Sequence, residues 1–209
     1  MLALYLDGNQ LTSVPAELGN LSSLKVLDLS GNHLISVPAE LGQLAALVTL
    51  NLSENQLTGV PAALGQLATL SELYLSDNQL SSVPASLGNL SSLTDMYLEG
   101  NLLTRVPAEL GNLAALKHLH LTGNPKLTSL HAELYHQFST LNNVVHLDKS
   151  LVTLIAAAHR FAEAAESGDD KGQVLLAQCY LQGRGVERDP ELAASWFRKS
   201  ADQGNAIGH

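Results

Sequence analysis

An asparagine recurs every 23 residues in the first part of this chain of 209 residues. The six copies are Asn9, Asn32, Asn55, Asn78, Asn101 and Asn124. Around them the sequence repeats the pattern L-x-x-L-x-L-x-x-N-x-L-x-x-V-P-A-x-L-G-x-L-x-x, as in residues 24–46. A fixed period in the range of roughly 20–50 residues indicates a stacked array, because one repeat alone cannot bury its own apolar side chains.

Each part of the repeat predicts a local structure. Leu27 and Leu29 alternate with Val26, Asp28 and Ser30, which indicates a short strand with one apolar face. The Val-Pro-Ala segment after it predicts a short helical turn, with Leu41 and Leu44 packed inwards and Gly42 allowing the backbone to bend. The asparagine side chain can bond backbone groups of its own turn and of the neighbouring turn, so stacked copies form a ladder.

This pattern resembles the leucine-rich repeat, and the resemblance covers residues 1–140 as six repeats. It implies an α/β solenoid, a horseshoe whose parallel strands line the concave face. Residues 141–150 are expected to be a degenerate repeat, a cap or a linker. Met1 occupies the first leucine position of a repeat, and repeat arrays normally need polar caps. We therefore expect the chain to be a fragment, or its first repeat to be covered by a neighbour.

Residues 151–209 change from strand-type to helix-type periodicity. Apolar residues from Leu151 to Ala165 fall on one stripe of a helix, and two further helical segments follow. Asp189 suits the N-cap of the third helix and Pro190 its first position. The glycines expected to end the three helices are Gly168, Gly183 and Gly204.

Residues 168–204 resemble a Sel-one-like repeat (SLR), which is related to the tetratricopeptide repeat. The matching positions are Gly168, Leu176, Tyr180, Gly183, Gly185, Val186, Asp189, Ala193, Trp196, Phe197, Ala201, Gln203 and Gly204, whereas Gly172 and Ala177 stand where the family usually has alanine and glycine. The resemblance implies an all-α helical-repeat segment, truncated at its C-terminus, with Gly183, Gly185 and Val186 shaping a loop. A phosphate-binding role for this loop is disfavoured, because the sequence contains neither a Walker motif nor a dinucleotide fingerprint.

Composition excludes several classes of partner. The net charge is −9 and no basic stripe is present, which argues against nucleic acid binding. No apolar run approaches the roughly 18 residues that a membrane helix needs, and the N-terminus does not resemble a signal peptide. Cys179 is the single cysteine, so an intramolecular disulfide is impossible. This favours a reducing compartment, and we expect a cytoplasmic protein.

Candidate catalytic and metal-binding groups are few. Serines recur at one position of the repeat and no G-x-S-x-G motif is present, so we expect no catalytic residues, no enzymatic activity and no cofactor. His118 and His120 are two residues apart on one predicted strand, and Asp95 occupies the position of His118 one repeat earlier. These three side chains suit zinc, but they equally suit a solvated patch. The sequence alone therefore assigns no metal.

The outward strand positions are the surface that varies between repeats. Tyr74 and Tyr97 are expected to be adjacent and exposed among carboxylates, which suits a protein partner with a basic or mixed-charge surface. The predicted contact residues are Asp28, Asn51, Glu72, Tyr74, Asp95, Tyr97, Glu99, His118 and His120.

These observations favour a non-enzymatic scaffold or adaptor, with one protein on the concave face and possibly a second on the SLR helices. An alternative is a regulatory or substrate-recognition arm of a ligase or kinase whose catalytic part lies outside this chain. The sequence leaves the partner, the pathway and the oligomeric state open.

Overall fold

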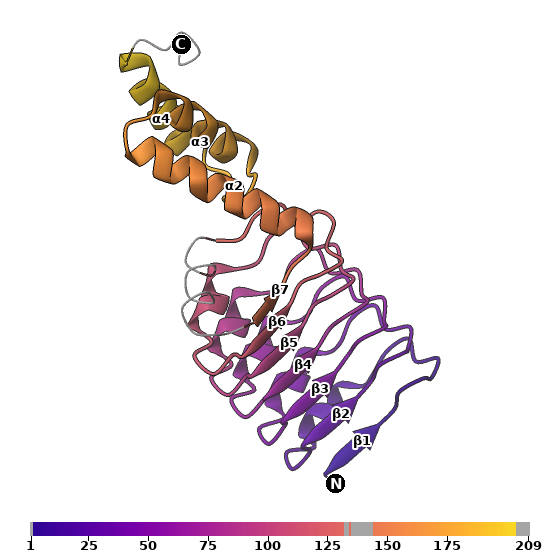
Figure 1. The fold of residues 1–209 in the computed structure, drawn as a ribbon. Helices are drawn as coiled ribbons and strands as arrows, with labels where there is room; N and C mark the ends of the chain where they lie inside the picture. The colour runs from indigo at the N-terminus through magenta and orange to yellow at the C-terminus, as the bar shows by residue number, and fades with distance from the viewer. Residues whose placement is uncertain (1, 132–133, 135–143, 204–209) are drawn as a thin grey trace. The chain divides into compact units, whose positions relative to one another are not determined.

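The computed structural model describes residues 2–131, 134 and 144–203, and the chain divides into two compact units. The first unit comprises Met1–Lys126 and Glu133–Leu147, and the second comprises Leu127–Ala132 and Asp148–His209. All strands of the sheet belong to the first unit, and helices α2, α3 and α4 belong to the second (Figure 1).

Parallel strands pair in chain order to form one sheet in the first unit (Figure 1). They are β1 (Ala3–Tyr5), β2 (Val26–Asp28), β3 (Thr49–Asn51), β4 (Glu72–Tyr74), β5 (Asp95–Tyr97), β6 (His118–His120) and β7 (Val144–His146). Between β1 and β6 each residue pairs with the residue 23 positions later, whereas His120 pairs with His146, 26 positions later. The predicted solenoid of parallel strands, followed by helices, is confirmed.

Short 3-10 helices form the return segments of the repeats. They are η1 (Ala16–Asn20), η2 (Ala39–Gln43), η3 (Ala62–Gln66), η4 (Ala85–Asn89) and η5 (Ala108–Asn112). A proline precedes each one, and those before η1 to η4 are in an extended conformation, as at Pro38 with φ −68°. The ring fixes φ and lacks an N–H that the first turn would leave unpaired, which explains why the turn starts there.

The core of the first unit is a stack of leucines. The central residue of each strand from β2 to β6 is fully or almost fully buried, and Leu41 and Leu44 of the return segment are 0% exposed. Burying a leucine side chain contributes about 1.5–3 kcal/mol relative to leaving it in water. Several such residues per repeat therefore tie each repeat to its neighbours.

The recurring asparagines join consecutive repeats through the backbone. Asn78 Nδ2 donates to the carbonyl oxygens of Leu52 at 3.0 Å, Leu75 at 3.1 Å and Ser76 at 3.2 Å. Its Oδ1 accepts from the backbone N–H of Leu57 at 2.9 Å. The copies from Asn32 to Asn124 are buried, but Asn9 is exposed and donates only within its own turn.

The recurring glycine of the return segment permits a close approach between repeats. The expectation that Gly42 allows a bend gave the wrong reason, because its backbone is not left-handed. A Cβ at Gly42 would instead overlap the carbonyl oxygen of Ala63 and lie 2.7 Å from its carbonyl carbon. Consecutive 3-10 helices therefore pack so closely that a side chain larger than a hydrogen atom does not fit at this position.

A second recurring position holds a left-handed residue after each of the first six strands. Glycine occupies it at Gly8, Gly31, Gly100 and Gly123, whereas Glu54 (φ 55°) and Asp77 (φ 53°) are non-glycine residues. A left-handed backbone costs an L-residue about 1–2 kcal/mol. Substitution by glycine removes this cost, but part of the gain is lost because glycine makes the unfolded chain more flexible. We predict that Glu54→Gly raises the free energy of unfolding by about 0.5–1 kcal/mol, measured by urea denaturation.

The control for this prediction is Gly31→Ala at the equivalent position. Its Cβ would meet only ordinary van der Waals neighbours, the nearest being Gly8 N at 3.4 Å, so the effect reports backbone strain. We expect a loss of about 1 kcal/mol. A Glu54→Gly variant less stable than the wild type would contradict the strain argument.

Three helices form the second unit: α2 (Lys149–Glu166), α3 (Asp170–Gln182) and α4 (Pro190–Asp202). Asp189 caps α4 by accepting from Leu192 N–H at 2.9 Å, and Pro190 begins the helix as predicted. Gly183 ends α3 in a left-handed conformation with φ 67°. Gly204, expected to end α4, lies outside the described residues. None of the described helices has the length and apolar character to cross a membrane.

Candidate functional site

The parallel register arranges the outward strand positions in two columns, which we call the strand face. The first column contains Ala3, Val26, Thr49, Glu72, Asp95, His118 and Val144. The second contains Tyr5, Asp28, Asn51, Tyr74, Tyr97, His120 and His146. Eight of the nine predicted contact residues belong to the strand face. The ninth, Glu99, directly flanks it. Neither column of these described strands contains a lysine or an arginine.

Four aromatic side chains of the second column stack in an uninterrupted row, which we call the ring ladder. The ring centroids are 4.5 Å apart from Tyr74 to Tyr97, 4.5 Å from Tyr97 to His120 and 4.0 Å from His120 to His146. The planes of the two tyrosines differ by 4°. Neighbouring strands lie about 4.8 Å apart, so planar side chains at paired positions reach stacking distance without moving the backbone.

This stacking changes what the tyrosines can offer a partner. Tyr74 and Tyr97 are half-buried, so the expectation that they are exposed is wrong. Tyr97 is stacked between Tyr74 and His120, and Tyr74 is stacked on one face by Tyr97, so these ring faces are closed to a cation. The ring edges and hydroxyls remain for contact, and the stacked rings are already ordered before any partner binds.

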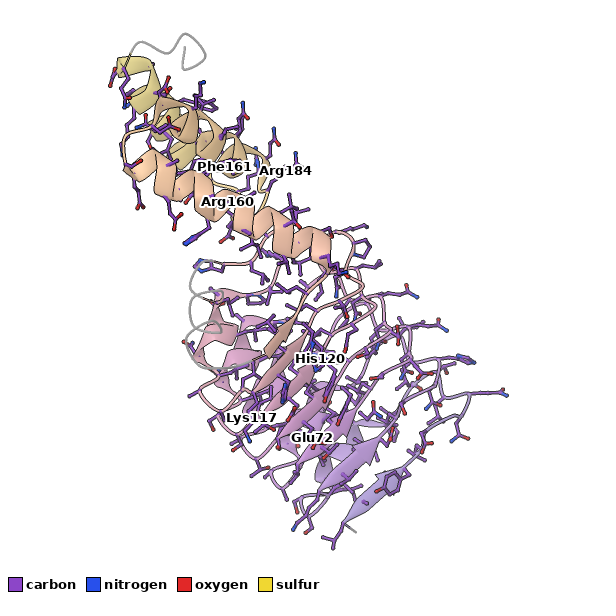
Figure 2. The ribbon with its side chains drawn as sticks, viewed as in Figure 1. Glu72, Lys117, His120, Arg160, Phe161 and Arg184 are labelled. Atoms are coloured by element: carbon purple, nitrogen blue, oxygen red, sulfur yellow. The ribbon has the colours of Figure 1, made fainter. Side chains whose placement is uncertain are left out.

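Carboxylates beside the ring ladder are held by hydrogen bonds. Glu72 Oε2 accepts from the Tyr74 hydroxyl at 3.2 Å and lies 3.4 Å from Thr49 Oγ1. Asp95 Oδ2 accepts from Thr94 Oγ1 at 2.6 Å. Figure 2 shows Glu72 and His120 on the sheet of the first unit. These bonds fix the positions of the carboxylates while leaving the surface acidic.

A hydroxyl–carboxylate–imidazole chain lies further along the strand face. Ser76 Oγ donates to Glu99 Oε2 at 2.6 Å, and Glu99 Oε1 lies 3.1 Å from His120 Nδ1. The His120 side chain is 21% exposed and that of Glu99 is 29% exposed. The pairing favours the His120 tautomer with its proton on Nδ1.

The protonation of the ring ladder follows from this environment. Burial raises the pKa of Tyr74 to about 12, and the neighbouring Glu72 carboxylate acts in the same direction. Burial also raises the pKa of Tyr97, with a further contribution from Asp95. Burial lowers the pKa of His120, although Glu99 opposes this effect. At neutral pH the tyrosines are therefore uncharged hydrogen-bond donors, and His120 is an uncharged imidazole.

The other end of the strand face mixes polar and apolar side chains and lacks this aromatic order. Asn51 Nδ2 donates to Asp28 Oδ2 at 3.3 Å, and Ser30 Oγ donates to Asp28 Oδ1 at 2.7 Å. Tyr5 is 64% exposed. Asp28 and Asn51 thus contact each other as the register dictates, but neither belongs to the ring ladder.

Three histidines come together where β6 meets β7. Each of His118, His120 and His146 contributes one ring nitrogen, and these three nitrogens all lie within 4.8 Å of one another. The cluster considered from sequence contained Asp95, which is not in this group. Sequence reasoning missed His146 because it lies 26 positions after His120 and breaks the 23-residue period. The signal for it was the apolar-flanked triplet Val-Val-His, which resembles a strand.

In the second unit, the Gly183–Gly185 loop has a packing role. A Cβ at Gly185 would overlap the carbonyl oxygen of Leu154 and lie 2.6 Å from its carbonyl carbon. The Gly185 N–H donates to the Thr128 carbonyl oxygen at 2.9 Å, so this N–H is already used in a hydrogen bond within the protein. Burial raises the pKa of the Cys179 thiol, which disfavours the reactive thiolate.

Comparisons with known proteins agree with this architecture. A family model described as a leucine-rich repeat region matches residues 3–179, and a Sel1 repeat model matches residues 170–205. The end of the first match covers α2 and most of α3, which contain no strand, whereas the second begins at the first residue of α3. Repeats of both kinds are typical of protein-interaction scaffolds. No curated protein matches the chain.

Among solved structures, the chain is similar to a leucine-rich repeat protein of Leptospira interrogans. The two are 35% identical with a TM-score of 0.56, and the similarity covers 69% of this chain. The matched part makes up 42% of the solved chain, so this protein corresponds to less than half of that one.

Proposed function

We infer that this chain, which belongs to the leucine-rich repeat family, is a non-enzymatic scaffold that binds a basic protein segment on its strand face. The observation that supports this most directly is the ring ladder with Glu72, Asp95 and Glu99 around it and no lysine or arginine in either column of the described strands. We assign a second partner to the SLR helices, on the strength of the family match at residues 170–205.

The proposed partner contacts the carboxylates with lysine or arginine side chains. Glu72 and Glu99 are already oriented by Tyr74 and Ser76, so a partner meets ordered acceptors and less side-chain entropy is lost on binding. The tyrosine ring edges add contact area between the charged groups. Aromatic side chains in ordered surroundings are the residues on which binding energy concentrates.

We predict that Tyr97→Ala lowers partner affinity by about 30-fold, a change of about 2 kcal/mol, because it removes an interior ring of the stack. Glu72→Lys is expected to weaken binding to a similar extent by placing a like charge opposite the partner. The measurement begins with affinity capture from cell lysate and mass spectrometry. It continues with titration of the captured partner by isothermal calorimetry.

The matched control is Glu109→Lys in η5, which makes the same charge change at an exposed position outside the strand face. Tyr97→Phe keeps the ring but removes the hydroxyl, so it should retain most of the affinity. Circular dichroism verifies that every variant folds. Equal affinity of Tyr97→Ala, Glu72→Lys and Glu109→Lys for the captured partner would place the binding site elsewhere.

A further inference from the structure

We propose that His118, His120 and His146 form a binding site for a single Zn²⁺ ion at the β6–β7 end of the strand face. The proposal rests on the distances between the imidazoles and on the partners of His120. It does not depend on whether the strand face binds a protein.

The sheet brings three imidazoles from two paired strands to one place. His118 and His120 are separated by one inward residue on β6, and His146 is the direct register partner of His120 on β7. One nitrogen from each ring lies within 4.8 Å of the other two. Tetrahedral zinc with bonds of about 2.0–2.1 Å places its nitrogen ligands roughly 3.3–3.4 Å apart. The distance between any two of the ligand nitrogens must therefore shorten by at most about 1.5 Å when zinc binds.

The proposed site requires the three imidazole rings to rotate about their side-chain torsions. The rings of His120 and His146 are stacked with planes 14° apart, so their in-plane nitrogen lone pairs lie in two nearly parallel planes, and both rings must tilt towards each other to share one metal ion. The ring of His118 is tilted by 44° to that of His120 and by 32° to that of His146. The terminal torsion of histidine is broad, so the rings can turn towards one point while the strands stay fixed.

The hydrogen bonds of His120 are those of a metal ligand. Histidines that bind metal usually donate their other ring N–H to a carboxylate, which fixes the tautomer and raises the basicity of the ligating nitrogen. Glu99 Oε1 lies 3.1 Å from His120 Nδ1, and Ser76 holds Glu99 through a 2.6 Å hydrogen bond. His120 Nε2 is then the nitrogen left with a free lone pair, and we assign it as the ligand atom.

The chemistry of the site favours zinc over magnesium or calcium. Neutral imidazole suits Zn²⁺ and other late first-row divalent metals, whereas Mg²⁺ and Ca²⁺ require oxygen ligands. Three histidines leave the fourth tetrahedral position for water or for a group supplied by a partner.

The test is titration of untagged protein with Zn²⁺ by isothermal calorimetry, with Co²⁺ as a spectroscopic probe of tetrahedral geometry. We expect about one equivalent to bind and tetrahedral Co²⁺ to show d–d absorption in the visible range. His146→Ala is expected to weaken binding at least 100-fold. Glu99→Leu, which leaves all three ligands in place, is expected to weaken it about 10-fold.

His159→Ala is the matched control, because His159 is exposed and lies on α2 of the other unit. It should bind zinc like the wild type. Thermal unfolding without metal verifies that each variant is folded, and the Glu99→Leu result remains informative if a histidine variant is not. Absence of binding by the wild type would overturn the proposal. Equal affinity of the wild type, His146→Ala and Glu99→Leu would overturn it as well.

Discussion

Replacing Gly65 with alanine is expected to lower the free energy of unfolding by about 3 kcal/mol, which is large for the addition of one methyl group. A Cβ at Gly65 would overlap the Ser86 carbonyl oxygen and lie 2.7 Å from the carbonyl carbon. Both atoms belong to the backbone of the next 3-10 helix, so no side-chain rotation relieves the contact. The neighbouring repeats must separate, which also loosens the leucines buried between them.

The control is Gly59→Ala, from the same repeat. Gly59 is exposed, its backbone is not left-handed, and a Cβ there meets nothing within 4 Å. We expect its stability to remain within about 1 kcal/mol of the wild type, because alanine reduces the entropy of the unfolded chain. Urea unfolding followed by circular dichroism measures both variants. A loss at Gly65 no larger than that at Gly59 would contradict the close-packing argument.

The second large effect is expected for Asn78→Ala, at about 3 kcal/mol or more. The substitution removes one acceptor and the amide group that donates to three carbonyl oxygens. Asn78 is only 6% exposed, and its hydrogen bonds to Leu57, Leu52 and Leu75 are buried, whereas the bond to Ser76 is part-buried. A buried polar group that loses its partner costs about 1–3 kcal/mol.

Asn9→Ala is the matched control, since Asn9 is exposed and bonds only Leu6 and Asp7 of its own turn. Its effect should stay within about 0.5 kcal/mol. The comparison is again made by urea unfolding, with the slope inspected for loss of cooperativity. Similar losses for Asn9→Ala and Asn78→Ala would show that the contacts between repeats contribute little.

The repeat period was sufficient to predict the strand register. Because Asp95 follows Glu72 by 23 residues and His118 follows Asp95 by 23, their alignment in one column required no three-dimensional information. The same logic failed at His146, where the last step is 26 residues. A period predicts only those neighbours that obey it, and the departure occurs at the histidine cluster.

Side-chain conformation was not predictable in the same way. The sequence placed Tyr74 and Tyr97 about one strand spacing apart but did not determine whether their rings stack or splay. Both rings are half-buried, and stacking covers both faces of Tyr97 and one face of Tyr74, which cation–π binding would otherwise use. Gly42 is similar: its recurrence was evident, but only the structure identifies the Ala63 carbonyl group that excludes a side chain.

The helical unit was more accessible to local rules. The Asp189–Pro190 pair specifies the start of α4 through one side-chain hydrogen bond and one fixed φ, and both lie within adjacent residues. The role of Gly185 was beyond such rules, because it depends on Leu154, which is 31 positions earlier in the chain. Contacts between distant segments are what a single sequence reports least well.

The in-register sheet has a consequence for how the first unit folds. From β1 to β6 every strand pairs with a residue 23 positions away, so no pairing among them requires closure of a long loop. Loop-closure entropy grows only with the logarithm of loop length and is nearly the same for each of these repeats. Folding can therefore begin at any stable pair of repeats and spread in both directions at a constant entropic cost per step. The β6–β7 step closes a slightly longer loop, and the histidine cluster is complete only when that step has occurred.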